Sequence, residues 1–182
     1  KYGLSLNNFE KFDINNYPFK KIDRDIFTIP HDFGTVKIQD GCSHSCTYCI
    51  IWKVRPHYTF SYQEIDKQIS VCLQNKHTDI FLFGTDICLY MHNGHDLVDL
   101  LKHILNSFPD ITSLKLDSIN PGYERIYDLI DLIKSEPKMQ KDLDLAIQSC
   151  SDTILKSVGR THTFADLKKI TEYAGEDRKS TR

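Results

Sequence analysis

Short apolar runs alternate with longer amphipathic stretches between residues 35 and 173 of this 182-residue chain. Four runs have the length and composition of β-strands: 35–39, 79–83, 113–117 and 143–147. Elsewhere, apolar residues recur at spacings of three and four, which is the period of a helix with one buried face. This pattern predicts helices from about residue 61 and over 97–105, 126–133, 151–158 and 163–173.

Local signals support individual elements of this pattern. Ser61 and Glu64 form an S-x-x-E capping box at the start of the first helix. The run Asp79–Phe83 is almost continuously apolar, as expected of a strand with both sheet faces covered. Gly175 is placed to end the last helix at its carboxyl terminus.

Four strand–helix units in series predict a parallel α/β sheet with right-handed crossovers. Either a doubly wound sheet or part of a β/α barrel satisfies the pattern. The barrel is favoured because unusual polar residues follow the strands, at the edge where β/α barrels carry their chemistry. Those residues are the cysteine loop after 35–39, Gly84–Asp86, Asp117–Ser118 and Gln148–Ser149. Since four units cannot close a barrel, we expect a partial β/α barrel in an incomplete chain.

The ends of the chain lack this alternation. Residues 1–34 are irregular and rich in Asn, Asp, Phe and Lys, so we interpret them as a linker or the tail of a missing N-terminal domain. Residues 35–176 are expected to form the partial core domain. We interpret 177–182 as a non-native tail, because one back-translation of these residues spells a common sequencing-adapter string.

Charge and hydropathy indicate a soluble, cytoplasmic protein, which we expect to be a monomer. The chain has 23 basic and 25 acidic residues, so this segment has no general attraction for nucleic acid. No apolar run approaches the ~20 residues that span a bilayer. Six cysteines are sparse for a disulfide framework, and no signal peptide is visible.

Three of the cysteines, Cys42, Cys46 and Cys49, lie within eight residues at C-x3-C-x2-C spacing. A structural zinc site normally fills four ligand positions, and His44 or His57 is a possible fourth ligand. A thioredoxin-like redox pair would use only Cys46 and Cys49 and leaves Cys42 without a role. An iron–sulfur cluster held by three thiolates keeps one iron open for a small molecule. The spacing favours the cluster, and zinc is the main alternative.

Several motifs in order resemble the radical S-adenosylmethionine (radical SAM) methylthiotransferases, which replace C–H with C–S–CH3. The resemblance begins at Val36–Cys42 and continues through Cys46–Ile51. It extends through Phe83-Gly84-Thr85-Asp86 with Tyr90, Ser118-Ile119-Asn120-Pro121, and Gln148-Ser149-Cys150-Ser151-Asp152 with Leu155, Lys156 and Arg160. It covers about residues 35–173. The chain departs from the family's usual Pro at Trp52 and from its Arg-Gly at Arg55-Pro56.

The resemblance implies two cofactors and a set of binding residues. Cys42, Cys46 and Cys49 would bind a [4Fe–4S] cluster whose fourth iron takes the amino and carboxylate groups of S-adenosyl-L-methionine. The cofactor-binding residues it implies are Tyr48, Gly84, Asp86, Ser118, Gln148, Ser149 and Arg160. A second [4Fe–4S] cluster is expected only in the missing N-terminal domain.

The implied activity is methylthiolation of a hypermodified adenosine beside the anticodon of tRNA. Residues 37–51 look most like the branch that acts on threonylcarbamoyladenosine, with the isopentenyladenosine branch close behind. Asp86 slightly resembles the branch that modifies an aspartate of a ribosomal protein, which is an alternative. A zinc-stabilised binding module is the alternative from a different functional class. The implied partners are tRNA, bound by the full-length protein, and an electron donor that reduces the cluster.

Overall fold

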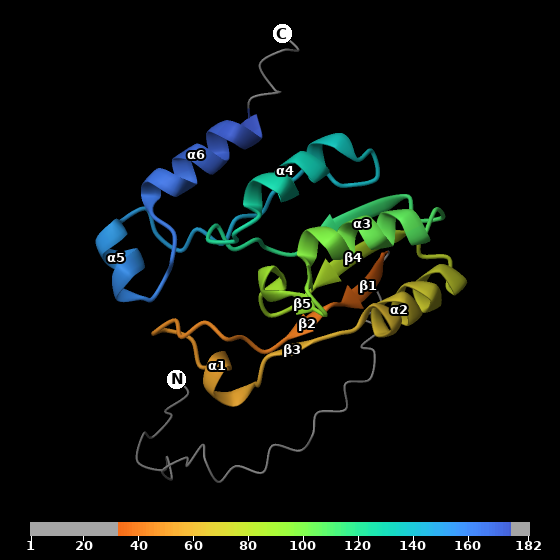
Figure 1. The fold of residues 1–182 in the computed structure, drawn as a ribbon, viewed down its shortest axis with the longest axis horizontal. Helices are drawn as coiled ribbons and strands as arrows, with labels where there is room; N and C mark the ends of the chain where they lie inside the picture. The colour runs from red at the N-terminus through yellow and green to blue at the C-terminus, as the bar shows by residue number, and fades with distance from the viewer. Residues whose placement is uncertain (1–32, 176–182) are drawn as a thin grey trace, which may run out of the picture.

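The structure is a computed structural model that describes residues 33–175. Its centre is a three-stranded parallel sheet in the order β1-β4-β7 (Figure 1). These strands are β1 (Gly34–Lys37), β4 (Asp79–Phe83) and β7 (Ser113–Leu116). Val36 is paired with Leu82, and Leu82 with Leu116, so the carboxyl ends of the strands meet at one edge. The predicted parallel α/β fold is confirmed, and it places every loop that follows a strand at this edge.

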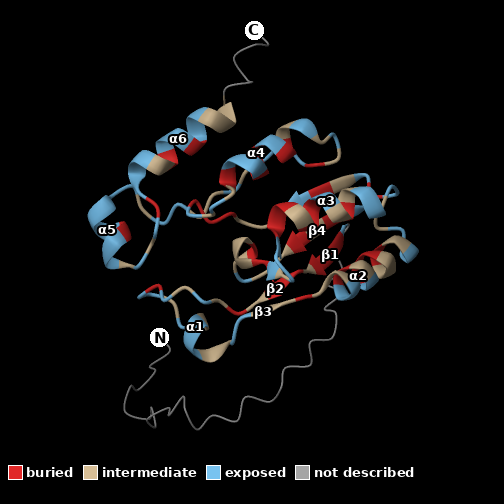
Figure 2. Ribbon diagram, viewed as in Figure 1, coloured by how far each residue is buried: buried red, intermediate tan, exposed pale blue. Residues whose placement is uncertain are grey.

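Helices cover one face of the sheet and bury its apolar side chains. They are α2 (Tyr62–Gln74), α3 (Leu97–Ser107) and α4 (Ile126–Ser135). Ile69 of α2, Leu101 of α3 and Leu82 of β4 are fully buried in one core, and Figure 2 shows buried positions concentrated on the sheet and the helices around it. Phe81 and Phe83 point to the other face, where they are half-buried and stack on each other. One face of the sheet is therefore helix-packed, which explains the helical periodicity.

The capping box predicted at the start of α2 is confirmed. The Ser61 hydroxyl accepts a hydrogen bond from the amide of Glu64, whose carboxylate accepts one from the amide of Ser61. Asp96 and Asp99 form a second capping box at the start of α3. Arg125 joins the beginnings of α3 and α4, because its guanidinium contacts Asp96 Oδ1 at 2.8 Å and Asp99 Oδ1 at 3.2 Å.

The predicted fourth strand, 143–147, is wrong. Leu145 makes a single parallel bridge to Ile119, and Met139 makes one to Leu114. The amide of Ile119 donates to Asp144, and the amide of Ala146 donates to Ile119. Segment 143–147 makes these two backbone hydrogen bonds with Ile119, which lies beyond the end of β7, so it forms an isolated bridge and not a continuous strand. The helices that follow, α5 (Asp152–Ser157) and α6 (Phe164–Gly175), match their predicted positions.

Two boundaries also differ from the sequence prediction. The run 35–39 is divided: β1 ends at Lys37, and β2 (Gln39–Asp40) pairs antiparallel with β3 (Tyr58–Thr59). Gly175 is the last residue of α6 rather than the residue just beyond the helix. The other short elements that were not predicted are α1 (Ile51–Val54), β3, the 3-10 turn η2 (Ile87–Leu89), and the hairpin of β5 (Met91–His92) and β6 (His95–Asp96).

None of the helices within residues 33–175 has the length and apolar character needed to cross a membrane. The segments interpreted as a linker and as a non-native tail, 1–34 and 177–182, lie almost entirely outside the described residues.

Candidate functional site

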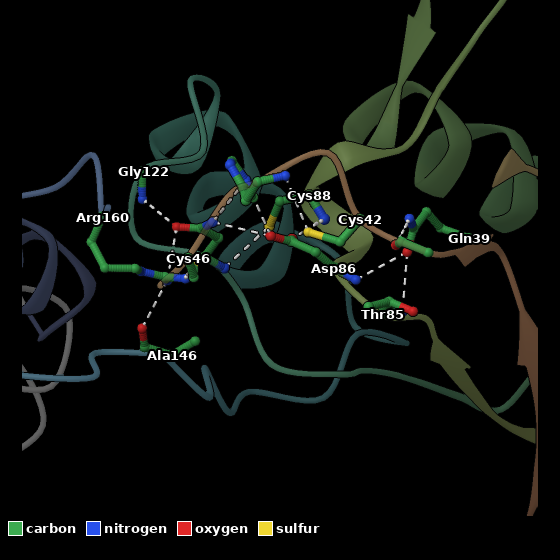
Figure 3. A network of polar contacts seen from close by, with 12 residues as sticks. Gln39, Cys42, Cys46, Thr85, Asp86, Cys88, Gly122, Ala146 and Arg160 are labelled. Atoms are coloured by element: carbon green, nitrogen blue, oxygen red, sulfur yellow. Dashed lines mark hydrogen bonds and ion pairs between the residues drawn. The ribbon is translucent and has the colours of Figure 1, made fainter. Parts of the chain in front are cut away.

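The three clustered cysteines lie on a loop between β2 and α1, at the carboxyl edge of the sheet (Figures 1 and 3). All three are free thiols. Cys46 is 6% exposed, whereas Cys42 and Cys49 are half-buried. The amide of His44 donates to Cys42 Sγ at 3.3 Å, and the amide of Cys49 donates to the carbonyl of Cys46 at 3.0 Å. The loop therefore has defined internal hydrogen bonds before any cofactor is considered.

Gly41 turns the chain from β2 into this loop. Its φ is +67°, a left-handed conformation that glycine adopts without steric cost. A Cβ at this position would collide with the carbonyl of Pro56. The backbone conformation therefore requires a glycine directly before the first cysteine of the motif.

The side chain of Gln39 joins the cysteine loop to the turn after β4. Gln39 is fully buried, and its Oε1 accepts hydrogen bonds from the amides of Thr85 and Asp86, both at 3.0 Å (Figure 3). Its Nε2 donates to the carbonyls of Asp40 at 2.9 Å and Gly41 at 2.5 Å. All four hydrogen bonds of one amide are thus used to hold two loops together.

Asn120, 7% exposed, is a second junction between the loops. Its Nδ2 donates to Asp86 Oδ2 at 3.0 Å and lies 3.3 Å from His44 Nε2. His44 Nε2 is 3.4 Å from Asp86 Oδ2. The loop after β7 therefore contacts the turn after β4 and the cysteine loop at one point.

Arg160, from the loop between α5 and α6, completes this network. Its Nη2 donates to Asn120 Oδ1 at 3.2 Å and to the carbonyl of Ala146 at 3.1 Å. Its Nη1 lies 4.0 Å from Cys46 Sγ. Its Nε is buried and has no hydrogen-bond partner within the described part of the chain. The guanidinium thus brings a permanent positive charge next to the cysteine loop and keeps one donor unused.

The electrostatics keep two nearby thiols protonated. Burial raises the pKa of Cys42, and the Asp86 carboxylate raises it further. Burial and the same carboxylate raise the pKa of Cys88 to about 12. A bound metal would reverse this preference at a ligating cysteine, because metal coordination deprotonates a thiol. Cys88 instead accepts a hydrogen bond from the amide of Asn120 at 3.2 Å, which indicates a packing role.

The structure brings together some of the predicted site residues. Asp86 and Arg160 meet at Asn120, and Gly84 lies so close to Gln39 that a Cβ would come within 2.9 Å of its carbonyl oxygen. Tyr48, between the second and third cysteines, is 57% exposed. Gly84, Asp86 and Arg160 thus lie beside the cysteine loop, Tyr48 lies on it, and their binding of cofactor stays a prediction.

Three predicted residues are not joined to the loop by any hydrogen bond among the described residues. The amide of Ser118 bonds the neighbouring Asp117 side chain at 2.8 Å. Gln148 is exposed, with a left-handed φ of +65°. The Ser149 hydroxyl accepts from the amide of Ser151 at 3.1 Å, just before α5. Local turn and capping contacts thus occupy this region.

Sequence reasoning missed Gln39, Asn120 and the placement of His44. Each is a polar residue whose partners are distant in sequence, as in the contact of Asn120 with His44. In the sequence, the only sign of these contacts was the polar residue Gln39 at the end of the apolar run 35–39.

Within residues 33–175, no three His, Cys, Asp or Glu side chains converge on a point where they could hold a single metal ion. A zinc site needs such convergence. In a cubane each thiolate binds a different iron, so the three sulfur atoms stand farther apart than the ligands of a single ion do. The donor set therefore fits a cluster with three cysteine ligands better than the zinc module.

Comparison with known proteins gives the same answer. The family model of the radical SAM superfamily matches residues 36–180. A tRNA-2-methylthio-N(6)-dimethylallyladenosine synthase from Rickettsia typhi is 31% identical over 70% of this chain and 29% of its own length. The protein of the same name from Rhodopirellula baltica is 31% identical over 75% of this chain and 29% of its own length. The ribosomal protein uS12 methylthiotransferase RimO of Clostridium botulinum is 32% identical over 87% of this chain and 36% of its own length.

The chain belongs to the radical SAM superfamily. The curated relatives that it resembles are named for methylthio-group chemistry. It spans about a third of the length of these curated relatives.

Solved structures agree with the fold. The radical S-adenosylmethionine methyltransferase TsrM from Kitasatospora setae superposes with a TM-score of 0.61 at 14% identity, over 79% of this chain and 28% of that one. The cobalamin-dependent S-adenosylmethionine radical enzyme OxsB superposes with a TM-score of 0.58 at 18% identity, over 78% of this chain and 22% of that one. At these identities the likeness concerns the fold alone, and it confirms a partial radical SAM barrel.

Replacing the bridging amide should loosen the site. Gln39→Leu removes the buried acceptor of the hydrogen bonds from the amides of Thr85 and Asp86, so we expect the free energy of unfolding to fall by about 1–3 kcal/mol. Chemical denaturation measures this change. Gln140→Leu is the control, because its Nε2 makes only an exposed contact with Ser113 Oγ at 3.1 Å. Equal unfolding midpoints for both variants would show that Gln39 does not hold the two loops.

Proposed function

We propose that this chain is the cluster-binding and SAM-binding core of an enzyme that adds a methylthio group to a hypermodified adenosine next to the anticodon of tRNA. Family membership supports the reaction class, and the names of the Rickettsia and Rhodopirellula relatives support an adenosine of tRNA as the substrate. The observation that carries the proposal is the cysteine loop itself. It presents three free thiols, beside a buried polar network, at the edge of the sheet where such folds perform chemistry.

The ligands proposed for the [4Fe–4S] cluster are Cys42, Cys46 and Cys49. When bound, such a cluster supplies the electron that cleaves S-adenosyl-L-methionine and so provides the radical that activates a C–H bond. The chain's own contribution is to position the cofactors and to exclude water. Gly41 and Gln39 fix the start of the cysteine loop for this purpose.

The charges at the site suit the proposed ligands. The Arg160 guanidinium, 4.0 Å from Cys46 Sγ, would compensate the negative charge of that thiolate, and its unused Nε offers a donor to a carboxylate. Asp86 would accept a hydrogen bond from the ammonium group of SAM. Gly84, which has no Cβ, would let the methionine part of SAM approach the backbone. Tyr48 is exposed and would cover the adenine.

Other predicted contacts receive less support. Ser118, Gln148 and Ser149 stay predictions, because Ser118 and Ser149 make local hydrogen bonds and Gln148 is exposed. The threonylcarbamoyladenosine substrate rests on the resemblance of residues 37–51. The two tRNA-modifying relatives described above are instead named for dimethylallyladenosine. The proposed substrate is therefore a hypermodified adenosine. Nucleoside analysis distinguishes whether that adenosine carries a threonylcarbamoyl or a dimethylallyl group.

A ribosomal-protein substrate is the second candidate. The observation that favours it is the Clostridium botulinum relative, which matches 87% of this chain and is named for ribosomal protein uS12. Asp86, which slightly resembles this branch, points the same way.

Any of the changes Cys42→Ala, Cys46→Ala or Cys49→Ala should abolish cluster binding, because two thiolates do not hold the cubane against solvent. Iron content and visible absorption of anaerobically purified protein measure this. Cys72→Ala is the matched control: Cys72 is 5% exposed on α2, and its loss should cost only ~1 kcal/mol of packing while the iron is kept. Loss of iron in the Cys72 variant with retention in Cys42→Ala would refute the ligand assignment.

Deleting the gene should remove a methylthio-adenosine from tRNA, because no other step of the proposed reaction installs that group. Mass spectrometry of tRNA nucleosides from the deletion strain tests this and identifies the adenosine side chain. Unchanged tRNA together with a ribosomal protein lighter by one methylthio group would overturn the proposal in favour of the second candidate. Unchanged tRNA and unchanged ribosomal proteins would refute both.

A further inference from the structure

An exposed apolar and basic surface follows the third cysteine directly. We call it the α1 surface, and it consists of Ile50, Trp52, Lys53 and Arg55. Ile50 is 53% exposed and Trp52 is 38% exposed. Helix α1 buries none of its residues, and Figure 2 shows it largely exposed beside the β2–β3 ribbon. Large apolar side chains grouped on a loop next to a reactive site commonly mark a binding surface.

The charge of this surface differs from that of the chain as a whole. The chain carries a net charge of −2, yet residues 41–63 contain no Asp or Glu and include Lys53 and Arg55. The nearest carboxylate is Asp40, which lies 3.0 Å from Arg55 Nη1 and 3.0 Å from Lys37 Nζ. One acid shared by two bases leaves positive charge, to which Lys53 adds. The α1 surface thus offers a local attraction for phosphate that the overall charge conceals.

This surface lies within reach of a substrate at the cluster. Trp52 is three residues after Cys49, so at most about 11 Å of chain separates them. A molecule held on Trp52 would therefore lie next to whatever reacts beside the cysteine loop.

Trp52 and Lys53 make a cation–π contact that a nucleotide base could displace. Lys53 Nζ lies 4.9 Å from the centre of the Trp52 ring. An exposed cation–π contact is weaker than the stacking of a base on an aromatic side chain. A base that displaces Lys53 from the ring would free its ammonium group to meet the adjoining phosphate. One residue pair can thus supply both parts of single-strand RNA recognition.

We propose that the α1 surface binds an unpaired RNA nucleotide that flanks the modified adenosine, with the base stacked on Trp52 and its phosphate held by Lys53. This inference rests on the proposed function and deepens it, since it assigns to this chain a direct contact with looped, single-stranded RNA. An aromatic ring beside cations that outnumber the acid paired with them, Asp40, favours RNA over a protein partner.

Binding of two synthetic RNAs to the full-length protein that carries this chain tests the proposal. The first is a stem-loop with an adenosine in its loop, and the second is the same stem closed as a perfect duplex. Trp52→Ala should weaken stem-loop binding about tenfold or more and leave duplex binding unchanged. Trp52→Phe, which keeps a ring, should retain most of the affinity. Lys53→Gln should weaken binding and reduce the slope of log K against log salt by about one.

Matched controls are Phe164→Ala and Lys102→Gln. Phe164 is 48% exposed on α6 and Lys102 is exposed on α3, so neither change should alter RNA binding. The cluster content of each variant verifies that its site is intact.

The inference would be overturned if Trp52→Ala and Lys53→Gln bound the stem-loop as tightly as the controls do. Binding of the stem-loop by the wild-type protein would still leave the proposed function standing. Failure of the wild-type protein to bind the stem-loop would count against the tRNA substrate itself, and weaker binding of a ribosomal-protein substrate by Trp52→Ala would assign the surface to a protein.

Discussion

The buried amide of Gln39 is the interaction on which the geometry of the site depends. Its four hydrogen bonds join the first residues of the cysteine loop to the turn after β4. Because β1 and β4 are parallel and adjacent, their carboxyl ends meet at one edge, and a single side chain can span both loops. The other contact described between the cysteine loop and this turn is that of His44 with Asp86, at 3.4 Å. The position of the thiols relative to Asp86 therefore depends on Gln39, the first residue of β2.

A second layer of contacts converts this edge into a charged site. Asn120 contacts Asp86, His44 and Arg160, which come from three other segments. One neutral amide thus separates a carboxylate from a guanidinium and orients both. The arrangement places positive charge near Cys46 and negative charge near Cys42. Ligands with an ammonium group and a carboxylate, such as an amino acid moiety, complement this pair of charges.

How much of this was predictable depends on the range of the interactions. The helices α3 and α4 were readable because their apolar spacing reflects burial on one face, and Leu101 and Leu129 are fully buried. The segment 143–147 has the composition of a strand, but a run of side chains does not reveal how many ladder bonds an edge position makes. The β5–β6 hairpin carried a usable signal, since its turn is Asn93-Gly94 with φ values of 51° and 82°. The cysteine spacing was equally local and equally readable. Gln39 and Asn120 were not, because their roles come from partners 46 and 76 residues away.

The central claim is that three cysteines hold a cluster whose fourth iron stays open for S-adenosyl-L-methionine. Electron paramagnetic resonance of the anaerobically reduced, full-length protein, recorded with and without S-adenosyl-L-methionine, tests it most directly. Because a ligand on the open iron changes the electronic environment of the cluster, the account predicts an iron–sulfur signal whose shape changes when the molecule is added. An iron–sulfur signal that the addition leaves unchanged, or a protein that contains zinc and no iron, would contradict it.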